Sequence, residues 1–178
     1  TDQQEYLLAL ARNSIRDKLQ GERPAPEPPE AEALNQPCGA FVTLKKHGRL
    51  RGCIGNIRSN DPLFKTVSDM AVAAATQDPR FPPVSLSELD QARIEISALS
   101  PLDKVDDPAE IQVGVHGLFI RKDTFSGLLL PQVPVEWKWD RDTFLQQTCR
   151  KAGLPPDAWK DPQTEIFRFS ADVFGEPE

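Results

Sequence analysis

Prolines divide this chain into short segments and so limit the length of any helix or strand that it can form. Five of the 17 prolines lie in residues 22–37, others stand at positions 79, 82 and 83, and another group surrounds 131–134. Because proline interrupts both helices and sheet ladders, each group predicts a loop or a bend. We expect residues 22–37 to form an extended tether that carries the chain from a first helix to a sheet.

Hydrophobic periodicity in the remaining segments predicts an α+β fold. Apolar residues recur every three or four positions in three predicted helices, at 2–20, 62–77 and 141–152. The alanines of the second helix indicate close packing on a sheet, and we expect Asp61 and Asp140 to cap the second and third helices. Strand patterns occupy 38–44, 49–57, 92–100, 111–123 (broken at His116–Gly117) and 164–172. Helices and strands do not alternate as βαβ units, which favours a mostly antiparallel sheet flanked by helices.

Composition and charge argue against several classes of partner. The 178 residues carry a net charge of −6 and the isoelectric point is about 5.0, so we expect neither nucleic acid nor an anionic membrane as a partner. The first residues lack the basic region of a signal peptide, and none is expected. The three cysteines form no C-x-x-C motif, so a disulfide framework is not expected and a cytoplasmic location fits best.

A local basic cluster contrasts with this acidic composition. Strand patterns at 38–44 and 49–57 flank the turn sequence KKHG and predict a β-hairpin. The basic residues around this turn are Lys45, Lys46, His47, Arg49, Arg51 and Arg58. Such a cluster is typical of a solvated hairpin tip, and it could also bind an anion; the sequence leaves both interpretations open.

The second strand of this hairpin, RLRGCIGNI, carries the most specific chemistry in the chain. Strand alternation predicts that Arg51 and Cys53 share one face, where a guanidinium could favour the thiolate form of the cysteine. Gly52 and Gly55 would let a ligand or another backbone approach closely. The alternative is that Cys53 is a small buried side chain, as free cysteines often are.

Few other residues could complete a site around this cysteine. His116 is the better candidate for a partner base, because His47 is expected in the hairpin turn; a structural role for His116 is the alternative. Asp78 and Arg80 could pair within a turn or position an anion. No metal site is expected, because the cysteines and histidines lack metal-ligand spacing. Trp137 and Trp139 should project from one strand face and cover a core.

Several of these segments, taken in order, resemble the AMMECR domain family. They are LRGCIG, AAATQDPRFPPVSLSEL, IEISALSP, GVHGLFI, GLLLPQVPVEW and FLQQTCRKAGL, within residues 38–174 of a single domain that spans 1–178. The resemblance implies an α+β fold with a smaller α/β subdomain and a cleft between the two parts, lined by the LRGCIG segment. The chain has Asn56–Ile57 where Thr-Phe is more usual in the family.

The resemblance also implies partners. Prokaryotic members are labelled protein A of the AmmeMemoRadiSam system, beside a Memo-like protein and a radical-SAM protein. We expect Cys53, with His116, to be presented to a small molecule or a modified substrate, with Arg51, Gly52, Gly55, Asp78 and Arg80 in binding roles. The alternative is a non-enzymatic interaction module in which the glycine-rich hairpin is a docking or structural feature. The resemblance identifies neither a reaction nor a cofactor.

Overall fold

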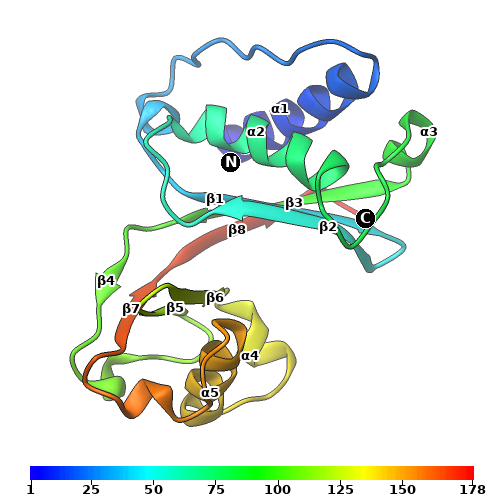
Figure 1. Cartoon of the computed structure of the whole chain (residues 1–178). Helices are drawn as coiled ribbons and strands as arrows, with labels where there is room; N and C mark the ends of the chain where they lie inside the picture. Colours follow the sequence, from blue (N-terminus) through cyan, green and yellow to red (C-terminus); the bar gives the residue numbers. More distant parts are fainter. The chain divides into compact units, whose positions relative to one another are not determined.

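The computed structural model describes all 178 residues and contains two four-stranded sheets with helices packed on them (Figure 1). The α-helices are α1 (Asp2–Leu19), α2 (Leu63–Thr76), α3 (Leu86–Leu89), α4 (Gln132–Glu136) and α5 (Arg141–Lys151). The 3₁₀ helices are η1 (Glu32–Asn35), η2 (Pro108–Glu110) and η3 (Ala158–Lys160). The strands are β1 (Ala40–Lys46), β2 (Arg49–Asn56), β3 (Ala92–Leu99), β4 (Asp103–Lys104), β5 (Gly117–Lys122), β6 (Phe125–Leu129), β7 (Glu165–Phe169) and β8 (Ala171–Gly175).

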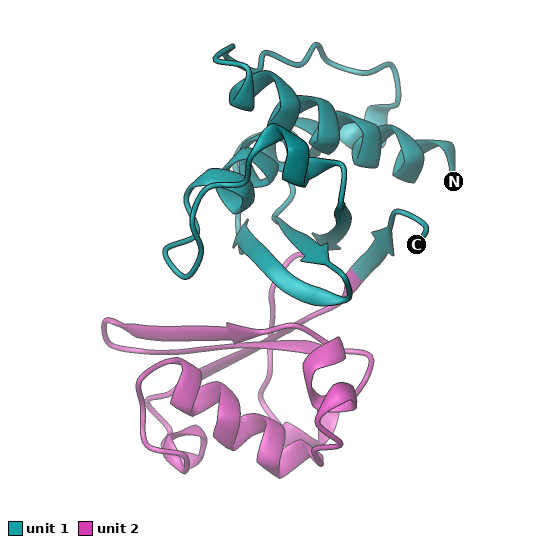
Figure 2. Cartoon of the chain, turned by 90° about the vertical axis from the view of Figure 1, so that its right-hand side faces the viewer, with its two compact units in different colours: residues 1–99, 172–178 teal, residues 100–171 magenta.

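The chain divides into two compact units, each with its own sheet and its own hydrophobic core (Figure 2). Unit 1 consists of residues 1–99 and 172–178, and unit 2 consists of residues 100–171. Both sheets pair antiparallel neighbours, and helices accompany each sheet, which confirms the predicted α+β class. The cleft expected from the family resemblance stays a prediction.

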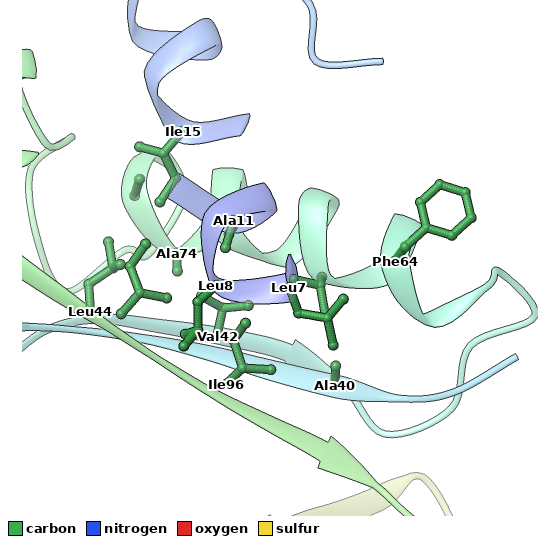
Figure 3. Packing of buried hydrophobic residues seen from close by; sticks show 14 of the residues in the cluster. Leu7, Leu8, Ala11, Ile15, Ala40, Val42, Leu44, Phe64, Ala74 and Ile96 are labelled. Carbon is green, nitrogen blue, oxygen red and sulfur yellow. The ribbon is translucent and has the colours of Figure 1, made fainter. Parts of the chain in front are cut away.

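Unit 1 is a sheet in the order β2-β1-β3-β8, with α1 and α2 on one of its faces (Figure 1). The predicted stripe of α1 is buried, including Leu7, Ala11 and Ile15. This stripe packs with α2 and with the inward-facing side chains of the strands, as Figure 3 shows. The alanines of α2 allow the close approach expected from the sequence: Ala71 and Ala74 are buried in the core, and the Ala74 backbone lies against Gly52 of β2.

The segment from 22 to 37 is largely irregular, as expected for a tether, apart from η1. Leu34 is buried and belongs to the core of unit 1, so it attaches the tether to the unit. The carbonyl oxygen of Gln36 accepts a hydrogen bond from the Leu63 N–H at 2.9 Å, where α2 begins.

Unit 2 is a sheet in the order β4-β7-β5-β6, and α5 packs against β5 and β6. The Asp140 carboxylate accepts the Thr143 N–H at 2.8 Å and caps α5, as predicted. Phe144, Leu145 and Cys149 of α5 are fully buried among apolar side chains of the strands. Gly153 follows the helix with a φ of +80°, the left-handed conformation expected of a terminating glycine.

Two predictions about local structure are wrong. The residue that caps α2 is Pro62, which makes no side-chain cap, and Asp61 instead forms an exposed ion pair with Lys65. The predicted strand at 111–123 begins only at Gly117, because 112–116 forms a turn in which the N–H groups of Val115 and His116 bond to the Gln112 carbonyl.

Two further corrections concern the C-terminal part of the chain. Trp137 is not on a strand that covers a core: it follows α4, is 68% exposed and stacks on Trp139 with ring centroids 6.1 Å apart. The predicted strand at 164–172 divides into β7 and β8, which belong to different sheets. The last residues of the chain are held on unit 1, because Glu176 accepts hydrogen bonds from Arg12 and from the Ile94 N–H.

Candidate functional site

A β-bulge in the β1–β2 hairpin decides where Cys53 lies. The hairpin turns through His47 and Gly48, both with positive φ, and Lys46 pairs with Arg49. The pairing shifts by one residue between Leu44 and Lys45, so Cys53 lies opposite Thr43. Continued without that shift, the register would place Cys53 opposite Val42, a fully buried core residue. The bulge therefore moves the cysteine off the core side of the sheet.

The same bulge changes the expected relation between Arg51 and Cys53. Arg51 is the extra residue of the shifted pairing, because Leu50 lies opposite Lys45 and Gly52 lies opposite Leu44. Its guanidinium does not bond to Cys53. It forms two hydrogen bonds with the Glu88 carboxylate, both at 3.0 Å, and one with the Pro82 carbonyl at 2.8 Å. The predicted effect of Arg51 on the thiol is therefore not present in this geometry.

The thiol of Cys53 is partly buried and contacts a hydroxyl group. Its Sγ lies 3.2 Å from the Oγ1 of Thr43. Burial raises the pKa of the Cys53 thiol, while the Thr43 hydrogen bond and the charge of Arg80 act in the opposite direction without offsetting it. At neutral pH this burial therefore favours the neutral thiol over the thiolate, the other state that the sequence left open.

Asp78 fixes the backbone of Cys53. Since β2 is an edge strand, the Cys53 N–H points away from β1, and the Asp78 carboxylate accepts it at 3.0 Å. The same carboxylate accepts the backbone N–H and two guanidinium bonds of Arg80, at 2.8–3.0 Å. These bonds hold the pKa of Asp78 well below its usual range, led by the Arg80 side chain. Asp78 and Arg80 thus pair within the turn, which is one of their two expected roles. Through its bond to the Cys53 N–H, Asp78 also holds the LRGCIG segment of β2 in place.

Phe81 lies next to both arginines of this cluster. The Arg51 and Arg80 guanidinium carbons are 5.7 and 5.5 Å from the Phe81 ring centroid. The Arg80 side chain is half-exposed, whereas that of Asp78 is almost completely buried. The segment after α2 therefore presents one accessible guanidinium beside the motif.

The two glycines of the motif are required by close packing. A methyl group on Gly52 would overlap the Ala74 carbonyl oxygen of α2, and one on Gly55 would overlap the Phe41 ring of β1. Both positions are therefore filled by protein atoms, which accounts for these glycines without a ligand.

His116 lies in unit 2, whereas Cys53 lies in unit 1, so their pairing stays a prediction. The Nδ1 atom of His116 accepts the Gln112 N–H at 3.0 Å. Burial, with the nearby charge of Arg168, lowers the pKa of His116. A neutral imidazole that accepts at Nδ1 carries its proton on Nε2, and it must give up the Gln112 bond to accept a second proton. This arrangement is typical of a structural histidine.

Two contacts of the site were not predicted from the sequence. The contact between Thr43 and Cys53 can be predicted only from a hairpin register that includes the bulge. No residue type at Leu44–Lys45 marks a bulge there. Glu88, which also bonds to Lys46 at 3.1 Å, lies within the short helix α3 that the sequence pattern did not predict.

Other features of the molecule add no ligand to this cluster. The better-formed surface pockets include one with Arg51 in its wall, and Cys53 and His116 do not line them. No group of three or more histidine, cysteine or acidic side chains is arranged to hold a metal ion. None of the helices combines the length and the apolar character needed to cross a membrane.

The chain is similar to known proteins both in sequence and in fold. Residues 8–174 match the profile of the AMMECR1 family. The chain is 47% identical to Protein TK0174 of Thermococcus kodakarensis, covering 97% of this chain and 89% of the relative. It is 44% identical to Protein PYRAB00100 of Pyrococcus abyssi, with the same coverage. The crystal structure of uncharacterized protein PH0010 from Pyrococcus horikoshii has the same fold, with a TM-score of 0.90 and 43% identity over 97% of this chain and 90% of that chain.

Proposed function

The chain belongs to the AMMECR1 family, and from this premise we propose that it acts with a Memo-like protein and a radical-SAM protein in a three-protein system. Its part is to present the LRGCIG segment to a small molecule or a modified macromolecule. The support for these partners is the family resemblance of the six ordered segments. The protein works in the cytoplasm in this proposal, in line with its unpaired cysteines.

The geometry supports binding and transfer of a substrate better than nucleophilic attack by a resting thiolate. The single observation that carries this choice is the environment of Cys53. Its backbone is fixed by Asp78, its sulfur contacts a hydroxyl at 3.2 Å, and burial raises the pKa of the thiol. A neutral thiol can take part in hydrogen bonds and packing with a ligand, but it is a poor nucleophile. Arg80, half-exposed beside it, is paired with Asp78 and offers its remaining guanidinium N–H donors to an anionic group.

A second function is favoured by a different observation. Gly52 and Gly55 are both explained by contacts within unit 1, with Ala74 and Phe41. The motif can therefore be a structural element of a non-enzymatic module whose hairpin docks a protein partner. In that case the Cys53 thiol has no chemical role.

Alkylation of the native protein tests the state of the thiol. We expect iodoacetamide to modify Cys53 more slowly at pH 7 than it modifies a free-cysteine peptide, with the rate rising above the ordinary thiol pKa of about 8.5. Cys149, which is completely buried, is the internal control and should react more slowly still. Mass spectrometry of the digested protein assigns each site. Rapid modification of Cys53 at pH 7 would reject the neutral-thiol proposal in favour of a thiolate nucleophile.

Co-purification tests the partners. The tagged chain is expressed together with the Memo-like and radical-SAM proteins of its own genome. We expect the wild-type chain and a Cys38→Ser control to retain at least one of them after washing in 0.3 M salt, a concentration that screens weak charge contacts. Failure of the folded wild-type chain to retain either protein would contradict the three-protein proposal.

A further inference from the structure

The tip of the β1–β2 hairpin carries a basic pocket that shares Arg51 with the cluster around Cys53 but is not lined by Cys53. Its walls are Lys46, His47, Arg49, Leu50 and Arg51, and its volume is about 450 Å³. We call it the tip pocket. All five residues belong to unit 1, and they surround the two-residue turn at His47–Gly48.

Positive charge in the tip pocket exceeds the negative charge that the protein supplies there. Glu88 is the carboxylate that pairs with Lys46, at 3.1 Å, and also with Arg51, at 3.0 Å. These bonds, led by that of Arg51, lower the pKa of Glu88 to about 2, so it is ionised at neutral pH. Arg49 is exposed and takes part in no ion pair. Lys46 and Arg51 thus share one carboxylate while Arg49 has no acidic partner, in a chain whose net charge is −6.

Part of this charge is fixed in place before any ligand arrives. The Arg51 side chain is only 11% exposed, and it is held by Glu88, by the Pro82 carbonyl and against the Phe81 ring. The bulge at Arg51 directs this side chain out of strict strand alternation, as bulges commonly do. A guanidinium held in this way loses less conformational entropy on binding than a free surface arginine.

An apolar side chain completes the tip pocket. Leu50 is 43% exposed although it lies within β2, and it stands between the two arginines in sequence. Exposed leucine among cationic groups provides a surface for the carbon skeleton of an anionic ligand.

We propose that the tip pocket binds a small phosphomonoester. Lys46, Arg49 and Arg51 bring three positive charges against the single negative charge of Glu88, and the two that remain match a phosphate dianion. The exposed guanidinium of Arg49 can bind a tetrahedral oxyanion through paired hydrogen bonds, whereas that of Arg51, already bonded to Glu88 and Pro82, contributes its charge. Leu50 contacts the carbon part of the ester. The proposal does not depend on the Cys53 thiol or on the three-protein system.

An NMR titration with phenyl phosphate tests it. We expect saturable shifts of the backbone amides of residues 46–51, and weaker binding of inorganic phosphate, which has no ring to contact Leu50. Arg49→Gln should weaken the binding of phenyl phosphate about tenfold, since one charge-assisted hydrogen bond contributes at least that much. Arg49 makes no ion pair, and the dispersion of the same spectra shows that the variant is folded.

Arg58→Gln is the matched control, because Arg58 is also exposed, is close in sequence and does not line the tip pocket. It should leave the affinity unchanged. Absence of saturable shifts at the tip, or equal weakening by Arg49→Gln and Arg58→Gln, would overturn the proposal. Equal affinity for inorganic phosphate would replace the phosphomonoester by free phosphate, and tighter binding of a tetraglutamate peptide would assign the tip pocket to an acidic protein segment.

Discussion

Asp78 connects most of the interactions around the motif, and its importance can be measured. It accepts bonds from the Cys53 and Arg80 N–H groups and from the Arg80 guanidinium. Asp78→Ala should lower the free energy of unfolding at pH 7 by about 2 kcal/mol, because it leaves the partly buried N–H of Cys53 unpaired and removes the bonds to Arg80. Urea denaturation followed by circular dichroism measures the loss. Asp61→Ala, which removes an exposed ion pair with Lys65, is the control and should change stability by less than about 0.5 kcal/mol.

The loss caused by Asp78→Ala should also depend on pH. The pKa of Asp78 in the folded protein lies below the unfolded value of 3.8, so its ionised form stabilises the fold. This stabilisation is fully present well above pH 3.8 and is lost as the pH falls toward the folded pKa. The stability difference between wild type and Asp78→Ala should therefore be constant from pH 6 to 8 and become smaller below pH 4. A difference that stayed constant down to pH 3 would mean that the carboxylate charge is not involved.

At the scale of the elements, the contact between β2 and α2 predicts that Gly52→Ala destabilises the protein more than a glycine-to-alanine change elsewhere in the same sheet. Gly52→Ala should lower the free energy of unfolding by about 2–3 kcal/mol, because the new methyl group overlaps the Ala74 carbonyl and neither backbone can move easily. Gly175→Ala in β8 is the matched change, since a methyl there meets its nearest atom at 3.4 Å. It should cost less than about 1 kcal/mol. Similar midpoints for the two variants in urea would contradict this packing.

Elements whose signals lie within a few neighbouring residues could be predicted from the sequence. The stripe of α1, the Asp140 cap and the hairpin around His47–Gly48 depend on local spacing and turn chemistry. No residue type marks the bulge beside Leu44, so the sequence could not decide between the two environments left open for Cys53, a face shared with Arg51 or a small buried position. The division of 164–172 into β7 and β8 also has no local signal, because the residue that separates the two strands, Ser170, is neither proline nor glycine.

At the scale of the whole molecule, the chain holds two separate hydrophobic cores, one in each compact unit. The sequence pattern shows apolar periodicity, but it does not show which segments share a core. Unit 2 is one continuous segment, whereas unit 1 combines residues 1–99 with residues 172–178 from the C-terminal end of the chain. Glu176 attaches this C-terminal segment to the rest of unit 1, because its carboxylate binds Arg12 of α1 at 2.7 Å and the Ile94 N–H of β3 at 2.9 Å. Such contacts between distant segments have no local signature.

The two cores should respond separately to cavities. Leu44 in unit 1 and Leu145 in unit 2 are both fully buried, so each Leu→Ala change should cost about 2–5 kcal/mol. Hydrogen exchange measured by mass spectrometry on the full chain should then show where protection is lost. We expect Leu145→Ala to accelerate exchange in peptides from 100–171 more than in those from 1–99, and Leu44→Ala to do the reverse, because each cavity weakens the contacts of its own core. Uniform acceleration of all peptides in both variants would instead mean that the chain unfolds as one cooperative unit.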